Sequence, residues 1–445
     1  MMGCQEITRW VFRGGASIVA AFLVLAGPAQ AEEVGVNLSH LSLSQAESLW
    51  LSHNREIRLA RTVLDGAEAD TLSAAQRPNP QLSLAVSSLS AQPGIGTGNV
   101  RDKMMDTVVG LSQLVERGDK RDHRMRGAQS RFDAARQDFA DTLRGQRLAL
   151  HQAYYDLLLA QEKIRIAEES AALYRETVRA GQLRFKAGDI AAAELSRIRV
   201  EALRAENEAR QAAGDLARAR LALAYLLGRE GVAESLRADD SWPSLDMPPA
   251  TAAAIDARPD VQAAARRVLA AEAARDLARS LKTRDVTVGA QFEHNPTGTT
   301  YASNSYGVSV SMPLFIGYAY EGEIRRSEAD LQAAREKFEQ VRALALADQA
   351  RARSDLEIAG QRGARYQDEL LAEAERAARA AEFAYQRGAM GLMDLLDARR
   401  THKATQLDAA VARADQAKAL SAWRLANDSS AWAVSEQLLS AKTIP

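Results

Sequence analysis

A turn centred on a glycine occurs twice in this sequence, at Gly188 and again at Gly388. In both copies an aromatic residue stands three positions before the glycine, a carboxylate six after it, a leucine seven after and an arginine eleven after. Helix-forming sequence lies on both sides, so we expect each glycine to take the left-handed conformation that opens a helical hairpin. Two turns in matching contexts predict a chain built from a duplicated hairpin.

The segments around the two turns repeat as well. Residues 81–114 and 285–313 each contain two stretches that alternate apolar with small polar side chains around a turn-rich loop, which indicates a β-hairpin. Proline-free stretches at 117–228 and 317–432 follow, and each contains one glycine turn. The order strand, loop, strand, long helix, glycine turn and return helix is therefore predicted twice.

The first long helix has a regular apolar pattern, with spacings of seven and four residues. Its marker residues are Phe132, Phe139, Leu143, Leu150, Tyr154 and Leu158. These spacings average about 3.67 residues per turn and predict a straight or slightly right-handed helix, about 100 Å long at the α-helical rise. Alanine-rich hairpins of this length need neighbours around a ring, because each has little apolar mass. An ordinary elongated coiled coil is the alternative.

The chain divides into five predicted segments. They are a signal peptide (1–31), a first repeat (32–228), an equatorial linker (229–258), a second repeat (259–432) and a C-terminal tail (433–445). The signal peptide is indicated by Arg9 and Arg13, a short apolar run and a small-x-small pattern at 29–31. The single cysteine, Cys4, precedes that run, so the exported chain would have neither a disulfide nor a thiolate metal site.

Composition argues against several functional classes. The formal net charge is −1, so no basic excess favours a nucleic-acid partner. Aromatic residues make up 5% of the chain, which is typical of long packed helices. The six histidines lack metal-ligand spacing, and no catalytic triad, phosphate-binding loop or paired-acid cleft is recognisable. We therefore predict a protein that is not an enzyme and that has no cofactor and no metal site.

Four strands of about ten residues with one apolar face match the strands of a transmembrane barrel. Four strands cannot close around an interior, and an open edge in lipid would leave backbone groups unpaired. Two or three chains would have to share one barrel, and three would give twelve strands around a water-filled lumen. The predicted fold class is an α+β membrane protein with a shared β-barrel continued by an α-helical barrel. The alternative is a soluble sandwich or an edge hairpin packed on the helices.

Three motifs resemble the TolC-type outer-membrane factor family across nearly the whole exported length. They are the Tyr385-x-x-Gly388 turn, the run Asp394-Leu-Leu-Asp397-Ala-Arg399 that follows it, and Pro313-Leu314-Phe315 between strand and helix. The resemblance implies a homotrimer with a 12-stranded outer-membrane barrel and a periplasmic helical tunnel. It also implies docking to a periplasmic adaptor (membrane fusion) protein and an inner-membrane pump.

A finer resemblance lies at 111–124, Leu-Ser-Gln-Leu-Val-Glu-Arg-Gly-Asp-Lys-Arg-Asp-His-Arg. It is similar to a run of the CzcC-like branch, which serves heavy-metal exporters of the resistance-nodulation-division class, except that Asp119 replaces a glycine. We assign its residues Glu116, Lys120 and Arg121, together with Pro313, to the junction between strands and helices. The alternative to reading this run as a sign of a heavy-metal substrate is that it is only a solvated strand-to-helix junction near the membrane surface.

The resemblance also assigns the two turns to the adaptor-docking tip. The residues concerned are Gly188, Asp189, Arg387, Gly388, Ala389 and Met390. In part of the family a basic residue shortly after the tip glycine latches the tips closed. Met390 holds that place here, and Arg387 is the candidate substitute.

Carboxylates just beyond the turns are the candidate gate. Asp394 and Asp397 would face the narrowing tunnel, and Glu194 holds the equivalent place in the first repeat. Three chains would bring the aspartates together in one constriction, which forms a selective ring for cations. The alternative is that Asp394 pairs with Arg399 or another arginine on the helix surface.

These expectations define one leading function. It is the passive outer-membrane duct of a tripartite efflux system that exports heavy-metal cations, driven by an inner-membrane pump. The same channel in drug efflux or type I secretion is the first alternative. A soluble periplasmic coiled-coil adaptor or scaffold is the second, although an adaptor would normally show one hairpin rather than a full duplication.

Overall fold

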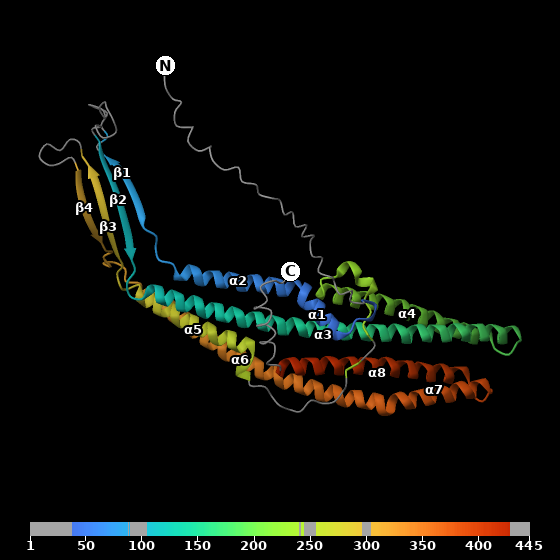
Figure 1. Cartoon of the computed structure of the whole chain (residues 1–445). Coiled ribbons are helices and arrows are strands. Elements are labelled where there is room, and N and C mark those ends of the chain that lie inside the picture. The colour runs from blue at the N-terminus through green and yellow to red at the C-terminus, as the bar shows by residue number, and fades with distance from the viewer. Residues whose placement is uncertain are drawn as a thin grey trace, which may run out of the picture. The chain divides into compact units, whose positions relative to one another are not determined.

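The computed structural model describes residues 38–87, 89, 105–239, 242–243, 255–295 and 304–427. The predicted signal peptide and C-terminal tail lie outside the described residues, as do residues 240–241 and 244–254 of the linker. The described part consists of long helices and one antiparallel sheet (Figure 1). The strands are β1 (Gln81–Ser87), β2 (Asp106–Val115), β3 (Val286–His294) and β4 (Asn304–Ser311), in the order β1-β2-β3-β4.

The helices follow the predicted repeat. The first repeat contains α1 (Leu43–His53), α2 (Arg55–Ala75), α3 (Lys120–Lys186) and α4 (Ala192–Leu226). The second contains α5 (Pro259–Ser280), α6 (Glu321–Arg365), a π-helical turn η5 (Tyr366–Leu370), α7 (Leu371–Gln386) and α8 (Leu392–Asn427). Short 3-10 turns lie at η1 (Leu38–His40), η3 (Glu230–Ser235) and η4 (Ile255–Ala257). None of the described helices combines the length and the apolar character needed to cross a membrane.

The strand register divides the sheet into an apolar face and a small polar face. One row across all four strands joins Leu84, Val109, Phe292 and Tyr306. The neighbouring row on the opposite face joins Ser83, Gly110, Gln291 and Gly307. Because side chains alternate between faces along a strand, rows two positions apart lie on the same face. The contrast holds for most rows, and the exceptions include Val108, Gln113 and Leu114 on β2. All four predicted strands are present.

Helix α3 is the element against which most others pack. It lies alongside α2, α4, α5 and α8 (Figure 1). Of the six predicted marker residues, five are buried and Phe132 is half-buried. Tyr154 is among the buried ones, and its hydroxyl donates to the Leu41 carbonyl at 3.0 Å. The stripe with spacings of seven and four is therefore the core face of α3.

An ionic cluster attaches α1 to α3. Glu47 of α1 accepts hydrogen bonds from Arg147, at 2.8 Å, and from His151 Nε2, at 2.6 Å. Burial alone would raise the pKa of Glu47, but the two hydrogen bonds and the charges behind them outweigh it and lower the pKa to about 2. Glu47 therefore stays ionised at every pH at which its unfolded counterpart is ionised.

The two long helices each differ from the expected pattern in one place. The first long helix begins at Lys120 rather than Arg117, because Gly118 and Asp119 have φ values of +73° and +54°, which an α-helix cannot contain. The second long stretch contains the π-helical turn beside α8, where the Tyr366 hydroxyl lies 3.4 Å from Asp408. An average apolar spacing cannot reveal a single wide turn.

Candidate channel wall, junction and tip

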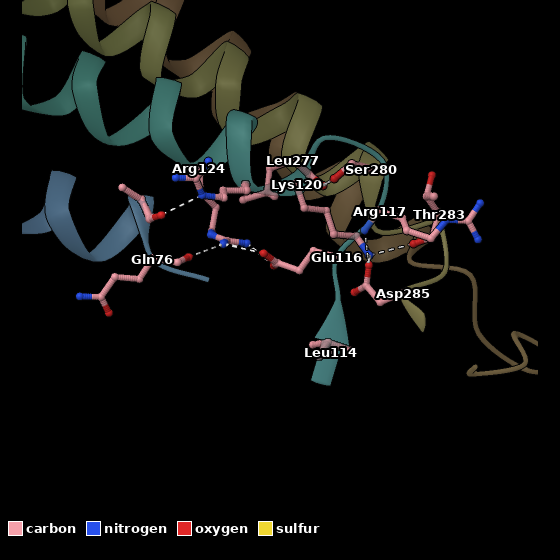
Figure 2. Close-up of polar contacts among 12 residues, drawn as sticks. Gln76, Leu114, Glu116, Arg117, Lys120, Arg124, Leu277, Ser280, Thr283 and Asp285 are labelled. Atoms are coloured by element: carbon pink, nitrogen blue, oxygen red, sulfur yellow. Dashed lines mark hydrogen bonds and ion pairs between the residues drawn. The ribbon is translucent and has the colours of Figure 1, made fainter. Parts of the chain in front are cut away.

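A buried ion pair joins the two repeats where the strands meet the helices. Lys120, only 6% exposed, donates from Nζ to Asp285 Oδ1 at 2.7 Å and to the Thr283 carbonyl at 2.8 Å (Figure 2). The backbone N–H of Arg117 donates to the same Asp285 oxygen at 2.9 Å. The start of α3 is thereby attached to the residues just before β3, and Lys120 is not solvated.

Two further contacts attach the end of α2 to this junction. Arg124 forms a two-pronged ion pair with Glu116 and also donates to the Gln76 carbonyl at 3.4 Å (Figure 2). The hydrogen bond to Glu116 raises the pKa of Arg124. Arg121 donates from Nε to the Ala75 carbonyl at 2.8 Å. The structure thus brings Glu116, Lys120 and Arg121 together, and each contributes to a contact between elements.

The turn that leads into α3 is tightly packed. A Cβ atom added to Gly118 would lie 2.7 Å from the Thr283 Cβ, in addition to the positive φ. Asp119 also has a positive φ, which aspartate tolerates better than most residues. A glycine at the position of Asp119 would fit the same left-handed backbone.

The second junction contains aromatic side chains in place of ion pairs. Pro313 is exposed, and the Phe315 ring lies 5.3 Å from Tyr320 and 5.4 Å below the Arg284 guanidinium. Tyr320 has a φ of +61° at the start of α6, the place that Asp119 occupies before α3. Sequence reasoning missed this cluster, although three aromatic residues within six positions were a signal in a chain so poor in them.

Both predicted glycine turns have the expected left-handed geometry. Gly188 has a φ of +83° and Gly388 one of +73°. After them the N–H of Asp189 donates to the Arg184 carbonyl and that of Ala389 to the Ala384 carbonyl, both at 2.9 Å. These bonds satisfy carbonyls that the helix end leaves free.

The remaining tip residues lie mostly at the surface. Asp189, Arg387 and Ala389 are exposed, whereas Met390 is half-buried. The Arg387 guanidinium lies 5.1 Å from the centre of the Phe383 ring, on its own hairpin.

The two hairpins pack against each other close to their tips. A buried apolar cluster combines residues from both, including Tyr174 and Ile198 from the first and Leu392 and Leu396 from the second. The Arg184 guanidinium lies 5.2 Å from the centre of the Tyr385 ring. The duplicated turns therefore form one composite tip within the chain.

Arg399 is the polar link in this contact. It is 9% exposed, and it donates from Nε to Glu382 at 3.1 Å and from Nη1 to the Thr177 hydroxyl at 2.8 Å. Glu382 belongs to α7 and Thr177 to α3, so Arg399 on α8 joins three helices. Sequence reasoning missed both partners, because they are 17 and 222 residues away along the chain.

The candidate gate carboxylates are presented at the surface. Asp394 and Asp397 are exposed, while Leu395 and Leu396 between them are buried. Glu194 is partly exposed in the first turn of α4. Within the described residues none of the three carboxylates has an ion pair or a side-chain hydrogen bond. Arg399, proposed above as a partner of Asp394, pairs with Glu382 instead.

The family model described as "Outer membrane efflux protein" matches residues 47–229 and 251–426. The chain belongs to this family, as its resemblance to the TolC-type factors predicted. It is therefore an outer-membrane efflux protein with a periplasmic extension and not an enzyme.

Two characterised proteins are similar in sequence. Protein CyaE of Bordetella pertussis is 28% identical over 71% of this chain and 69% of its own length. The cobalt-zinc-cadmium resistance protein CzcC of Cupriavidus metallidurans is 26% identical over 62% of this chain and 63% of its own length.

Solved structures with the same fold include two membrane proteins. The outer membrane protein VceC from Vibrio cholerae matches with a TM-score of 0.72 at 19% identity, over 86% of this chain and 95% of that one. CusC, described for its transmembrane channel formation, matches with a TM-score of 0.72 at 20% identity, over 86% and 91%. The predicted TolC-like α+β fold is confirmed.

We expect Gly118→Ala to destabilise the junction by about 2 kcal/mol or more, because a left-handed alanine is strained and its Cβ meets Thr283. Denaturant unfolding of the detergent-purified protein measures the change. Gly66→Ala is the matched control, since Gly66 lies in α2 with nothing within 4 Å of an added Cβ. The Gly66→Ala variant should be more stable than the unchanged protein by about 0.5–1 kcal/mol. Equal effects of the two variants would contradict the tight turn.

Arg399→Ala should loosen the composite tip, because it removes the link from α8 to both α7 and α3. Losing these charged hydrogen bonds should cost about 1.5 kcal/mol, which raises the population of the opened tip about tenfold. Tryptic cleavage after the exposed Arg387 should become faster by the same factor. Timed proteolysis with mass spectrometry measures this rate. Arg376→Ala removes an exposed pair within α7 and should leave the rate unchanged. Equal rates in both variants would show that Arg399 does not hold the tip.

Proposed function

We propose that three copies of this chain form one outer-membrane exit channel. The observation that carries the proposal is the sheet, whose apolar face extends over all four strands while β1 and β4 each have an edge that no other described residue pairs with. In lipid these edges must pair, because unpaired backbone groups cost several kcal/mol each. Pairing β4 of one copy with β1 of the next gives twelve strands in three copies, with the apolar face toward lipid.

The helices extend this channel into the periplasm as a tunnel. The composite tip exposes Asp189, Arg387 and Ala389 beside the two glycines, with Met390 partly accessible. We assign this surface to docking of a periplasmic adaptor, which connects the channel to an inner-membrane pump of the resistance-nodulation-division class. The chain itself is passive, and the pump supplies the energy.

Heavy-metal cations are the cargo that we propose. The similarity to CzcC, a cobalt-zinc-cadmium resistance protein, and the related run at 111–124 support this assignment. Asp394, Asp397 and Glu194 are accessible carboxylates beside the tip turns. Three copies would multiply them into a ring of negative charge that favours cations.

Deleting the gene should lower the tolerance of the cell to cobalt, zinc or cadmium salts, and a plasmid copy should restore it. Growth inhibition by graded metal concentrations measures the effect, with several organic antibiotics tested in parallel. Lost antibiotic tolerance at unchanged metal tolerance would overturn the metal assignment and favour the drug-efflux alternative.

Replacing both Asp394 and Asp397 by Asn should reduce the cation preference of the reconstituted channel by at least about twofold, because the ring loses its charge. Reversal potentials in a salt gradient measure this preference. Glu68→Gln serves as control, because Glu68 is an exposed carboxylate on α2, outside the tip. Unchanged selectivity in the double variant would place the two aspartates away from the lumen.

A further inference from the structure

The apolar stripe of strand β4 continues beyond the end of the strand. Every even-numbered residue from 306 to 318 is apolar or aromatic and is between 45% and 90% exposed. These residues are Tyr306, Val308, Val310, Met312, Leu314, Ile316 and Tyr318. The strand ends at Ser311, so the last four belong to the segment that leads from the sheet to α6. We call residues 312–318 the apolar extension.

One side chain of the apolar extension is anchored while its neighbours point outward. Phe315 packs between Tyr320 and Arg284, at 5.3 and 5.4 Å. Leu314 and Ile316 on either side of it remain exposed, and Ile316, at 90%, is the most exposed large apolar side chain of the described residues. A close backbone turn, with the Ile316 N–H 3.1 Å from the Leu314 carbonyl, accompanies this arrangement. The protein thus holds apolar side chains outside its own core.

We propose that the apolar extension lies in the headgroup–acyl boundary of the glycerophospholipid leaflet next to the periplasm. This inference rests on the proposed function, which puts the apolar face of the sheet in lipid. The extension follows that face directly along the chain, and its even-numbered side chains are exposed like those of the face. Apolar side chains that insert into this boundary gain the free energy of leaving water.

The order of side chains along the chain matches the layers of a membrane surface. Aliphatic residues of β4 and the extension come first, then Tyr318 and Tyr320, and then a charged segment with the exposed side chains of Glu321, Glu323, Arg325 and Arg326. Tyr318 has an apolar ring and a hydroxyl that donates to Glu323, the combination found in the aromatic belts at membrane interfaces. The exposed guanidinium of Arg284, above Phe315, can contact lipid phosphates at the same level.

A second copy of this chain is the competing occupant, and the direction of strand pairing argues against it. A copy that pairs with β4 forms backbone hydrogen bonds in the plane of the sheet. It would therefore lie beside the strand edge and leave the face with Val310 and Leu314 uncovered. Lipid is the partner that covers a face.

Site-directed spin labelling tests the proposal. Cys4 is the only cysteine, so Cys4→Ser gives a cysteine-free background. Labels are placed by Leu314→Cys and Ile316→Cys in the extension, by Val310→Cys on the apolar face of the sheet, and by Ser309→Cys on the polar face. The full chain is reconstituted in phosphatidylethanolamine–phosphatidylglycerol vesicles. Collisions of each label with oxygen, which prefers lipid, and with a water-soluble nickel chelate are compared.

We expect the oxygen-to-nickel collision ratio at Leu314 and Ile316 to exceed that at Ser309 severalfold and to stay below that at Val310. A ratio between those of Ser309 and Val310 means that Leu314 and Ile316 lie at a shallow depth in the lipid. If the label at Ile316 collides mainly with the nickel chelate while the label at Val310 collides mainly with oxygen, the inference is overturned and the proposed function stands. Low collision with both reagents at Ile316 would identify protein, a second copy, as the occupant. A collision ratio at Val310 as low as that at Ser309 would place the apolar face of the sheet in water and overturn the proposed function itself.

Discussion

The position of the sheet relative to the helices depends on one buried charge pair. Lys120 begins α3, the helix on which most of the others pack, and its ammonium is held by Asp285 and the Thr283 carbonyl just before β3. A buried ammonium without partners would be strongly destabilising, so the chain is constrained to bring these two distant segments together. That contact joins the first repeat to the second where their strands become neighbours.

Local patterns of the sequence predicted much of this architecture. Alternation of period two identified the strands, because each has one apolar and one small polar face, and the glycines identified the turns, because only they enter the left-handed region freely. Long-range contacts could not be predicted in this way. Nothing near Arg399 in the sequence indicates Thr177, and nothing near Lys120 indicates that it is buried.

The duplication conserves geometry while it changes chemistry. Both long helices start after a residue with positive φ, Asp119 in one repeat and Tyr320 in the other. The first start is held by ion pairs, and the second by an edge-to-face contact between Phe315 and Tyr320 and a tilted contact between Tyr318 and Tyr320. The difference follows the surroundings, because the aromatic junction continues an exposed apolar stripe, whereas Lys120 at the ionic junction is enclosed by protein.

The two hairpins also differ in how firmly they are held. Helix α3 has buried residues between Lys120 and Gly181 and packs against four other helices, whereas the only buried residue of α7 is Ala381 and its main neighbour is α8. The position of α7 therefore depends on α8, and that of α8 on its contacts with the first hairpin. Arg399 takes part in both, through Glu382 and Thr177. A change in this single side chain therefore reaches two helices at once.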